Sequence, residues 1–225
     1  MLKFVIPLLL APAALIIGQE LKPGQELKPG QELKPVALPT PQTSGGMPLM
    51  QALKNRKSAR DFSPEQLSKQ MLSNLLWAAW GINREDGRRT APSASNKQEI
   101  DVYVVMADGA YVYDAKANAL KPVVQKDVRA LAGTQAFVSE APLNLVYVAD
   151  TAKLGGGDAA RLAMSHANTG FIAQNVYLFC ASEGLGAVVR ASVNRADLAK
   201  ALNLRPEQQI TLAQTVGYVK KSVGD

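Results

Sequence analysis

The sequence predicts one α+β domain in which a mainly antiparallel sheet lies between two layers of helices. Strand-like segments alternate along the chain with amphipathic segments of helical period. Residues 100–107 and 110–114 flank an Asp108-Gly109 pair, which is a strong hairpin signal. Because a hairpin makes antiparallel neighbours, this three-layer arrangement fits better than a doubly wound parallel sheet. At 225 residues and 47% hydrophobic content, the chain can bury a sizeable core.

The first 18 residues are predicted to be a signal peptide. Lys3 precedes an apolar run over residues 4–17, which Pro7 and Pro12 interrupt. The run is shorter than the roughly 20 apolar residues of a spanning helix. We therefore expect an exported protein, periplasmic or secreted, with no stable membrane span after cleavage near Gly18. The alternative is an uncleaved anchor that holds the protein at a membrane.

Residues 19–46 are predicted to form a spacer. Three uninterrupted copies of Gly-Gln-Glu-Leu-Lys-Pro fill residues 18–35. A hexad with one Pro and one Gly per copy cannot continue a helix or a central strand. Proline stiffening favours an extended connection to the domain, which is predicted over residues 47–225.

Two helices are predicted at the start of the domain, with a cluster of cations between them. The first covers residues 47–56, and the second begins at Ser63-Pro64 and ends at Gly81. Residues 56–60 carry three cations and one hydroxyl. Side-chain charge and the amides of a neighbouring helix start together favour a bound anion in this connection.

The remaining elements follow in alternation. A polar loop over residues 82–97 precedes the hairpin. After the hairpin, the patterns predict a helix over 127–138, a strand over 143–149 and a long helix over 159–182, which Gly184 closes. A strand over 187–191, a helix capped by Asn194 and a final strand over 209–219 follow. Near the end of the polar loop, Asn96 and Gln98 carry amides able to pair with a heterocycle's imide edge or with the loop itself.

The sequence lacks the residues that several classes of function require. The single histidine, His166, lies in the long helix without a serine elbow, which argues against a Ser/His/Asp triad. No Cys/His cluster suits zinc, so no metal site is expected, and no Walker loop is present. Cys180 lies in an apolar helical run and is interpreted as a buried structural thiol. The net charge of +6 comes without the basic stripe and interleaved aromatics that indicate a nucleic-acid partner.

Four motifs, in order along the chain, resemble those of the FMN-dependent nitroreductase superfamily. Arg56-Lys57-Ser58-Ala59-Arg60-Asp61-Phe62 is similar to its opening Arg-x-Ser-x-Arg-x-Phe motif, and residues 91–98 resemble its Ala-Pro-Ser-x-x-Asn-x-Gln loop. Gly184-Leu185-Gly186 before an apolar strand and Val216-Gly217-Tyr218 resemble the other two. Residues 111–114 and Gly170-x-x-x-Gln174-Asn175-x-Tyr177-Leu178 look most like the branch that includes the azoline-forming peptide oxidases.

The resemblance implies a nitroreductase-type homodimer with FMN at the subunit interface. Arg56 and Ser58 would bind the phosphate and ribityl chain, beside Lys57, which could simply face water. Arg60 would approach the pyrimidine end of the ring, where a fixed cation stabilises the negative charge of the reduced flavin. The other implied cofactor contacts are Pro92, Ser93 and Asn96 from the partner subunit, Arg190, Ala191 and Ser192 beside flavin N5, and Lys220 at the phosphate.

The activity that the resemblance implies is ping-pong hydride transfer through flavin N5 to a nitroaromatic, quinone or similar acceptor, with no catalytic side chain. Ala191-Ser192 stands where many members carry Gly-Gly or Glu-Gly, and the domain has little room for a substrate lid. Export conflicts with NAD(P)H as donor, so the donor and acceptor stay open, and dioxygen is one possible acceptor. The alternatives are an azoline-type peptide dehydrogenase or oxidase and, in another class, a non-catalytic flavin-binding or interaction protein.

Overall fold

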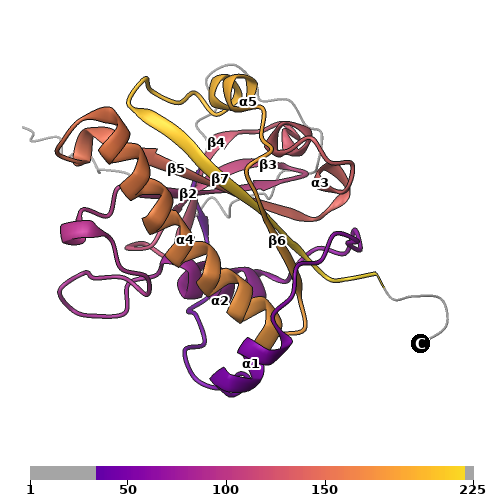
Figure 1. Ribbon diagram of the computed structural model, residues 1–225. Helices are drawn as coiled ribbons and strands as arrows, with labels where there is room; N and C mark the ends of the chain where they lie inside the picture. The colour runs from indigo at the N-terminus through magenta and orange to yellow at the C-terminus, as the bar shows by residue number, and fades with distance from the viewer. Residues whose placement is uncertain (1–33, 221–225) are drawn as a thin grey trace, which may run out of the picture.

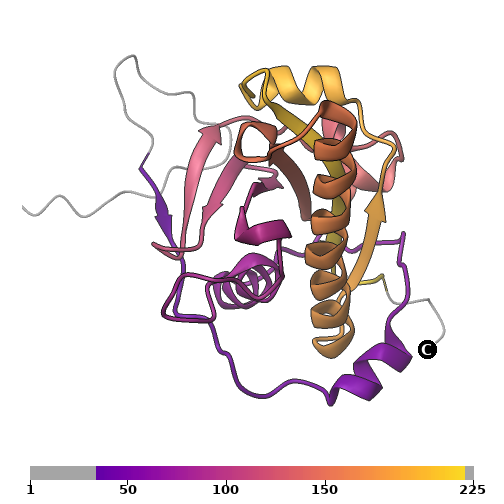
Figure 2. The same cartoon turned by 60° about the vertical axis from the view of Figure 1, so that its left-hand side comes forward.

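The computed structural model describes residues 34–220, which form a seven-stranded sheet flanked by helices (Figure 1, Figure 2). The strand order is β1-β4-β3-β2-β5-β7-β6, and every neighbouring pair is antiparallel. The strands are β1 (Val36–Ala37), β2 (Ile100–Met106), β3 (Gly109–Asp114), β4 (Ala119–Val124), β5 (Leu143–Asp150), β6 (Gly186–Arg190) and β7 (Gln208–Gly217). The helices are α1 (Leu49–Asn55), α2 (Lys69–Trp80), α3 (Phe137–Glu140), α4 (Asp158–Ser182) and α5 (Arg195–Ala201), with short 3-10 helices at Ala94–Asn96, Arg129–Ala132 and Thr151–Lys153.

Alternation along the central strands sends side chains into two separate helical layers. In β5, Leu145 and Tyr147 pack with residues of α2 and α4, whereas Val146 and Val148 pack with α5 and α3. All residues of β5 are buried, which explains its continuous apolar pattern. The long helix α4 crosses one face of the sheet (Figure 1). The predicted α+β class and its three layers are therefore confirmed.

The second helix begins later than its capping signal indicates. α2 starts at Lys69, and Ser68, not Ser63, is its N-cap. Residues 63–67 form no helix, and Phe62 before them is only 1% exposed and forms a β-bridge beside the end of the sheet. Tertiary burial thus overrides the local preference of the Ser63-Pro64 pair. The expectation that helix-start amides lie next to residues 56–60 is wrong.

Two further segments differ from their sequence patterns. Residues 127–138 do not form one helix, because Gly133 has an extended backbone and lies directly against the Arg190 guanidinium. Only a 3-10 turn and the short α3 form there. β4 is an additional strand that the sequence pattern does not predict. It contains Pro122, and proline is rare inside strands.

Residues 36–46, which the sequence assigns to the spacer, contact the domain. β1 pairs with β4, and Leu38 joins the core at 9% exposure. The backbone N–H of Gln42 donates to Oδ1 of Asn74 in α2 at 2.8 Å. The predicted signal peptide and most of the hexad repeats lie outside the described residues. Within residues 34–220, no helix combines the length and apolar character needed to cross a membrane.

The segment that follows α1 pairs with the open edge of β6. Ser58 forms a parallel bridge with Ala187, and the backbone N–H of Ala59 donates to the Ala187 carbonyl at 3.0 Å. Gly186 makes this approach possible, because a Cβ at that position would lie 2.8 Å from the Cβ of Ala59. The cationic segment is therefore a partial strand on the sheet edge and not a turn between two helices.

Gly186→Ala should push the segment over residues 58–62 away from β6. We expect the free energy of unfolding to fall by about 1–3 kcal/mol, because the added methyl group overpacks a tight contact. Urea unfolding followed by circular dichroism measures this. Gly155→Ala is the matched control, since a Cβ there meets no atom within 4 Å. Equal stability of the two variants would contradict the proposed close approach.

Candidate functional site

A tyrosine of α4 joins three segments at the open edge of β6. The Tyr177 hydroxyl lies 3.0 Å from Oγ of Ser58 and accepts the backbone N–H of Val189 at 2.8 Å. The Arg56 guanidinium lies over the Tyr177 ring, 5.3 Å from its centroid, at a distance suited to a cation–π interaction. Because Tyr177 is only 8% exposed, the helix fixes its position. Arg56 and Ser58 are thus brought together by a residue that the sequence places in a motif without assigning it to the site.

The backbone of β6 presents hydrogen-bonding groups along the same edge. The Ala187 carbonyl accepts from the motif segment, and the Val189 N–H donates to Tyr177. Residues two apart in a strand direct their polar groups to the same side. Ala191 follows the strand directly at a bend, and its N–H would be directed toward the same edge if the strand alternation continued by one residue. A planar polar group lying there could accept its hydrogen bond.

The other predicted cations lie near this edge and differ in whether they form ion pairs. Lys57 and Arg60 are exposed, and within residues 34–220 Arg60 has no ion-pair partner. The Lys220 ammonium lies 3.2 Å from a carboxylate oxygen of Asp61 and 3.8 Å from one of Glu140. Such exposed pairs contribute about 0–1 kcal/mol, so Lys220 can exchange its partners for a bound anion at small cost.

The side chain of Arg190 points to the opposite face of the sheet. Its guanidinium donates to the Ala132 carbonyl at 2.6 Å and to Asn144 Oδ1 and Thr215 Oγ1 at 2.9 Å each. Burial of this group lowers the pKa of Arg190 to about 10. The side chain therefore stabilises the packing of α3 and the adjoining turn on the sheet. Contacts of residues 190–192 with a ligand at the edge would come from backbone groups or from the exposed Ala191 and Ser192.

The predicted loop residues Pro92, Ser93 and Asn96 form a separate group in the chain. Ser93 Oγ accepts the backbone N–H of Gln98 at 2.9 Å, and Asn96 Oδ1 accepts from the Gln98 amide at 3.0 Å. The Gln98 side chain is thus engaged within its own loop. No hydrogen bond or ion pair in the described part of the chain joins this loop to residues 56–60. The two groups of predicted site residues therefore make no direct polar contact within the described part of the chain.

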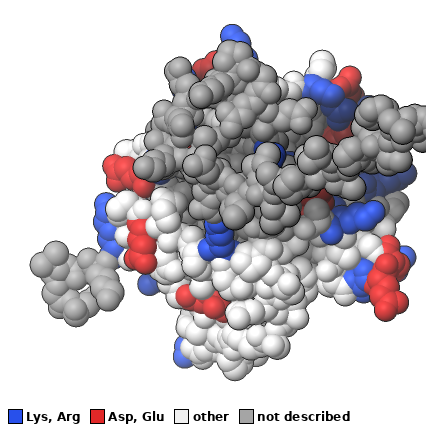
Figure 3. Space-filling view, turned by 180° about the vertical axis from the view of Figure 1, so that it is seen from behind, with Lys and Arg blue, Asp and Glu red and all other residues white. Residues whose placement is uncertain are grey.

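The edge site suits an anion that is attached to a planar polar group. Arg56 and Arg60 supply fixed charge, and Ser58 and backbone groups supply hydrogen bonds. Among residues 34–220, no three His, Cys, Asp or Glu side chains are grouped so that they could hold a metal ion. Cys180 is a buried free thiol whose pKa is raised by burial, which confirms its structural interpretation. On the face shown in Figure 3, the visible basic side chains are interspersed with acidic ones.

Comparison with known proteins gives consistent matches in sequence and structure. The sequence profile of the Nitroreductase family matches residues 53–218. A candidate nitroreductase of Methanocaldococcus jannaschii is 33% identical over 153 residues, which cover 62% of this chain and 76% of that protein. The crystal structure of a candidate nitroreductase from Ralstonia eutropha JMP134 superimposes with a TM-score of 0.80 at 41% identity, covering 89% of this chain and 99% of that chain.

A more distant match concerns the branch suggested by the sequence motifs. A chain of the Escherichia coli microcin synthetase complex has a TM-score of 0.64 and 21% identity, and the match covers 88% of this chain and 79% of that chain. At this identity the likeness shows a shared fold alone.

Tyr177→Phe should remove two hydrogen bonds while keeping the ring beneath Arg56. The Val189 N–H then loses its partner, so we expect stability to fall by about 1–3 kcal/mol and the Val189 amide proton to exchange about 10-fold faster. Denaturant unfolding and amide hydrogen exchange measure the two effects. Tyr113→Phe in β3, four strands away from β6 in the sheet order, should leave Val189 exchange unchanged. If the Val189 amide proton of the Tyr177 variant exchanges at the wild-type rate, Tyr177 does not satisfy the Val189 N–H as proposed.

Proposed function

Because this chain belongs to the nitroreductase family of oxidoreductases, we propose that it binds FMN at the open edge of β6 and acts as an FMN-dependent oxidoreductase. The observation that carries the proposal is the cluster around Tyr177, which holds Arg56 and Ser58 side by side. A guanidinium next to a hydroxyl offers charge-assisted hydrogen bonds of the kind that phosphate groups accept.

The proposed cofactor contacts follow from the positions of these groups. Arg56, Ser58 and Lys220 would hold the phosphate and ribityl chain, and the Ala191 N–H would face the ring. Arg60, which is exposed and free of an ion pair among residues 34–220, would place its charge near the pyrimidine end. A fixed cation at that position stabilises the negative charge of the reduced ring. Bound FMN would supply the redox chemistry by accepting and passing on a hydride at N5.

We further propose that two copies of the chain complete the site. α4 exposes the apolar side chains of Leu162 (39%), Met164 (43%) and Phe171 (49%), and α1 exposes Leu49 (62%) and Met50 (76%). Met164 and Phe171 are seven residues apart and lie on one face of α4, which packs beside α1. Exposed apolar residues on neighbouring helices indicate an interaction surface. A homodimer would cover them and would bring the loop with Pro92, Ser93 and Asn96 to the partner's flavin. This arrangement would account for the separation of the two halves of the site in one subunit.

The proposed reaction is a ping-pong reduction of a nitroaromatic, a quinone or a similar small acceptor. Donor and acceptor would use the same open face of the ring in turn. We also propose that the protein is exported, periplasmic or secreted, from the signal-like residues 1–18. An exported enzyme would need a donor other than cytoplasmic NAD(P)H, or would pass its electrons to dioxygen.

The second candidate function is azoline-type peptide dehydrogenation. The motif residues Gln174, Asn175 and Tyr177 favour it, as does the fold shared with a microcin synthetase chain. A flavin-binding protein without turnover is the third candidate.

Purified full-length protein separates these candidates. FMN reconstitution should give a stoichiometric yellow complex, and its anaerobic bleaching by NADH, NADPH or dithionite identifies the class of donor. A protein that stays colourless with excess FMN would contradict the enzyme proposal. A yellow protein that no acceptor or azoline peptide reoxidises would favour the non-catalytic alternative.

Arg56→Ala should raise the dissociation constant for FMN about 30-fold, which corresponds to roughly 2 kcal/mol for one charge-assisted contact. Lys57→Ala is the matched control, because the neighbouring side chain carries the same charge, whereas the cation–π contact and the hydroxyl contact with Tyr177 are made by Arg56 and Ser58. Fluorescence quenching of FMN on binding measures both. Similar losses in the two variants would show that only the overall charge matters.

Gly170→Leu should separate dimer formation from folding. A Cβ at this exposed helical position meets no atom within 4 Å in one subunit, so the monomer should tolerate the larger residue. A leucine there would obstruct close packing against a second copy of α4. Light scattering after size-exclusion chromatography should therefore report monomers with weakened FMN binding. A dimer that keeps its wild-type flavin affinity would argue against α4 as the interface.

A further inference from the structure

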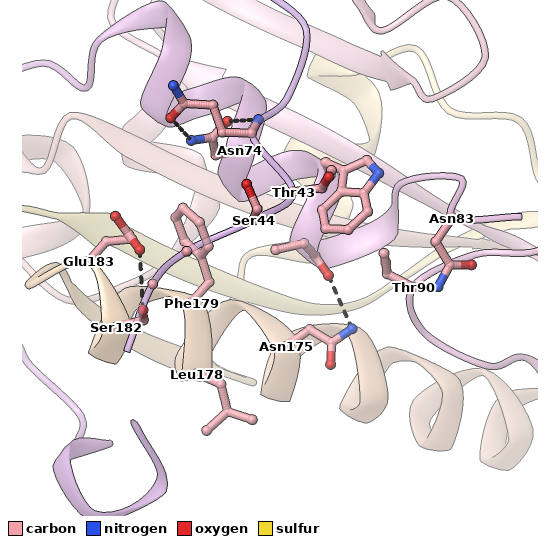
Figure 4. Close-up of a pocket in the computed structure, with 15 residues that line it drawn as sticks. Thr43, Ser44, Asn74, Asn83, Thr90, Asn175, Leu178, Phe179, Ser182 and Glu183 are labelled. Carbon is pink, nitrogen blue, oxygen red and sulfur yellow. Dashed lines mark hydrogen bonds between the residues drawn. The ribbon is translucent and has the colours of Figure 1, made fainter. Parts of the chain in front are cut away.

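A cavity of about 480 Å³ lies between α2 and α4 (Figure 4). Asn175 lines this cavity two residues before Tyr177, and two residues correspond to about 200° around a helix. The cavity and the edge of β6 are therefore reached from opposite sides of the same helical turn. Its volume lies in the range of sites for small molecules of two or three rings.

The charge of the cavity differs from that of the flavin edge. Among residues 34–220, Glu183 is the only ionisable residue that lines it, and no lysine or arginine of this range does so. The Glu183 carboxylate accepts the Ser182 hydroxyl at 3.2 Å. An anionic ligand would lose its hydration here without gaining a counter-charge, which is unfavourable. The cavity thus suits an uncharged molecule.

The lining combines aromatic surface with convergent amide and hydroxyl groups. Trp77 is held by its indole N–H, which donates to the Ile82 carbonyl at 3.1 Å. Asn175 donates its amide N–H to the Ala78 carbonyl at 3.1 Å, which leaves its Oδ1 as an acceptor. Thr90 also lines the cavity, and its buried hydroxyl has no hydrogen-bond partner within the described residues. Such a lining complements a planar ring that carries both a donor and an acceptor.

The outer wall of the cavity is a fixed segment of the chain that runs over residues 42–46. Gln42 and Asn74 exchange two hydrogen bonds, at 2.8 and 3.4 Å (Figure 4). The Met47 N–H donates to the Ser182 hydroxyl at 2.7 Å. Gly46 adopts φ +79, and a Cβ there would lie 2.9 Å from that hydroxyl oxygen. This segment is therefore built to close over the groove between α2 and α4.

We propose that this cavity is a second binding site, which takes an uncharged planar heteroaromatic molecule that bears an amide-like donor and acceptor pair. The cavity shares no lining residue with residues 56–60, so its ligand would not compete for the contacts of the Arg56 motif.

Nicotinamide is the probe for this chemistry, and nicotinate is its matched anionic control. Isothermal titration of full-length Arg56→Ala protein, which should carry little FMN, keeps the probe from stacking on a bound flavin. We expect nicotinamide to bind with a dissociation constant of about 1 mM, the scale for so small a ligand, and nicotinate to bind at least about 10-fold more weakly. Absence of nicotinamide binding, or equal binding of nicotinate, would overturn the proposal.

Two variants locate the bound probe. Thr90→Val keeps the shape of the side chain and removes a hydroxyl that has no hydrogen-bond partner among residues 34–220, so it should fold normally and weaken nicotinamide about 5-fold or more. Ala78→Leu places a larger side chain in the cavity and should abolish binding. Thr134→Val, at an exposed position outside the cavity lining, should change nothing. Unchanged affinity in the folded Thr90 variant would contradict the site.

The same titrations distinguish this inference from the proposed function. If wild-type protein binds no FMN but nicotinamide binds as described, the flavin proposal fails and the cavity proposal stands. If FMN binds and nicotinamide does not, the cavity proposal fails and the flavin proposal stands.

Discussion

The open edge of β6 is the constraint on which the rest of the structure depends. β6 is the last strand of the sheet, and the segment over residues 58–62 can pair with it only because Gly186 has no side chain. Phe62 anchors this segment through its buried ring, which lies 5.8 Å from that of Phe137. The cations of the motif thereby become attached to a rigid sheet, and not to a mobile turn. A cofactor site built on such an edge can hold its geometry without a ligand.

Tyr177 connects this edge to the longest helix. Its hydroxyl satisfies the Val189 N–H, a group that would otherwise be left without a partner on the edge strand, and it also positions Ser58. The same helix separates two environments of different charge. Arg56, Arg60 and Lys220 lie on the β6 side, whereas among residues 34–220 the cavity beside α2 is lined by amides, aromatics and a single carboxylate. We therefore expect the two sites to select ligands of different charge.

Much of the fold could be predicted from periodicity, and the reasons for the failures are physical. The apolar pattern of α4, the hairpin at Asp108-Gly109 and the Asn194 cap all match the structure. The Ser63 capping signal failed because a cap sequence carries no information about the distant burial of Phe62. The role of Tyr177 could not be predicted, because helical period assigns a residue to a face and not to a partner on another strand. For the same reason, the Arg190 side chain could not be assigned to the face opposite the site. The family motifs led to Arg56 and Ser58, which the structure brings together at Tyr177. The loop with Pro92 makes no polar contact with them among residues 34–220, and its role in the site depends on the proposed homodimer.

The central claim is that Arg56, Ser58 and Tyr177 form a site for the phosphate of a flavin. Equilibrium binding of FMN and of riboflavin, which has the same ring and no phosphate, tests it most directly. If the motif binds the phosphate, FMN should bind at least about 100-fold more tightly than riboflavin, as expected for two or more charge-assisted contacts. Equal affinities for FMN and riboflavin would contradict the account.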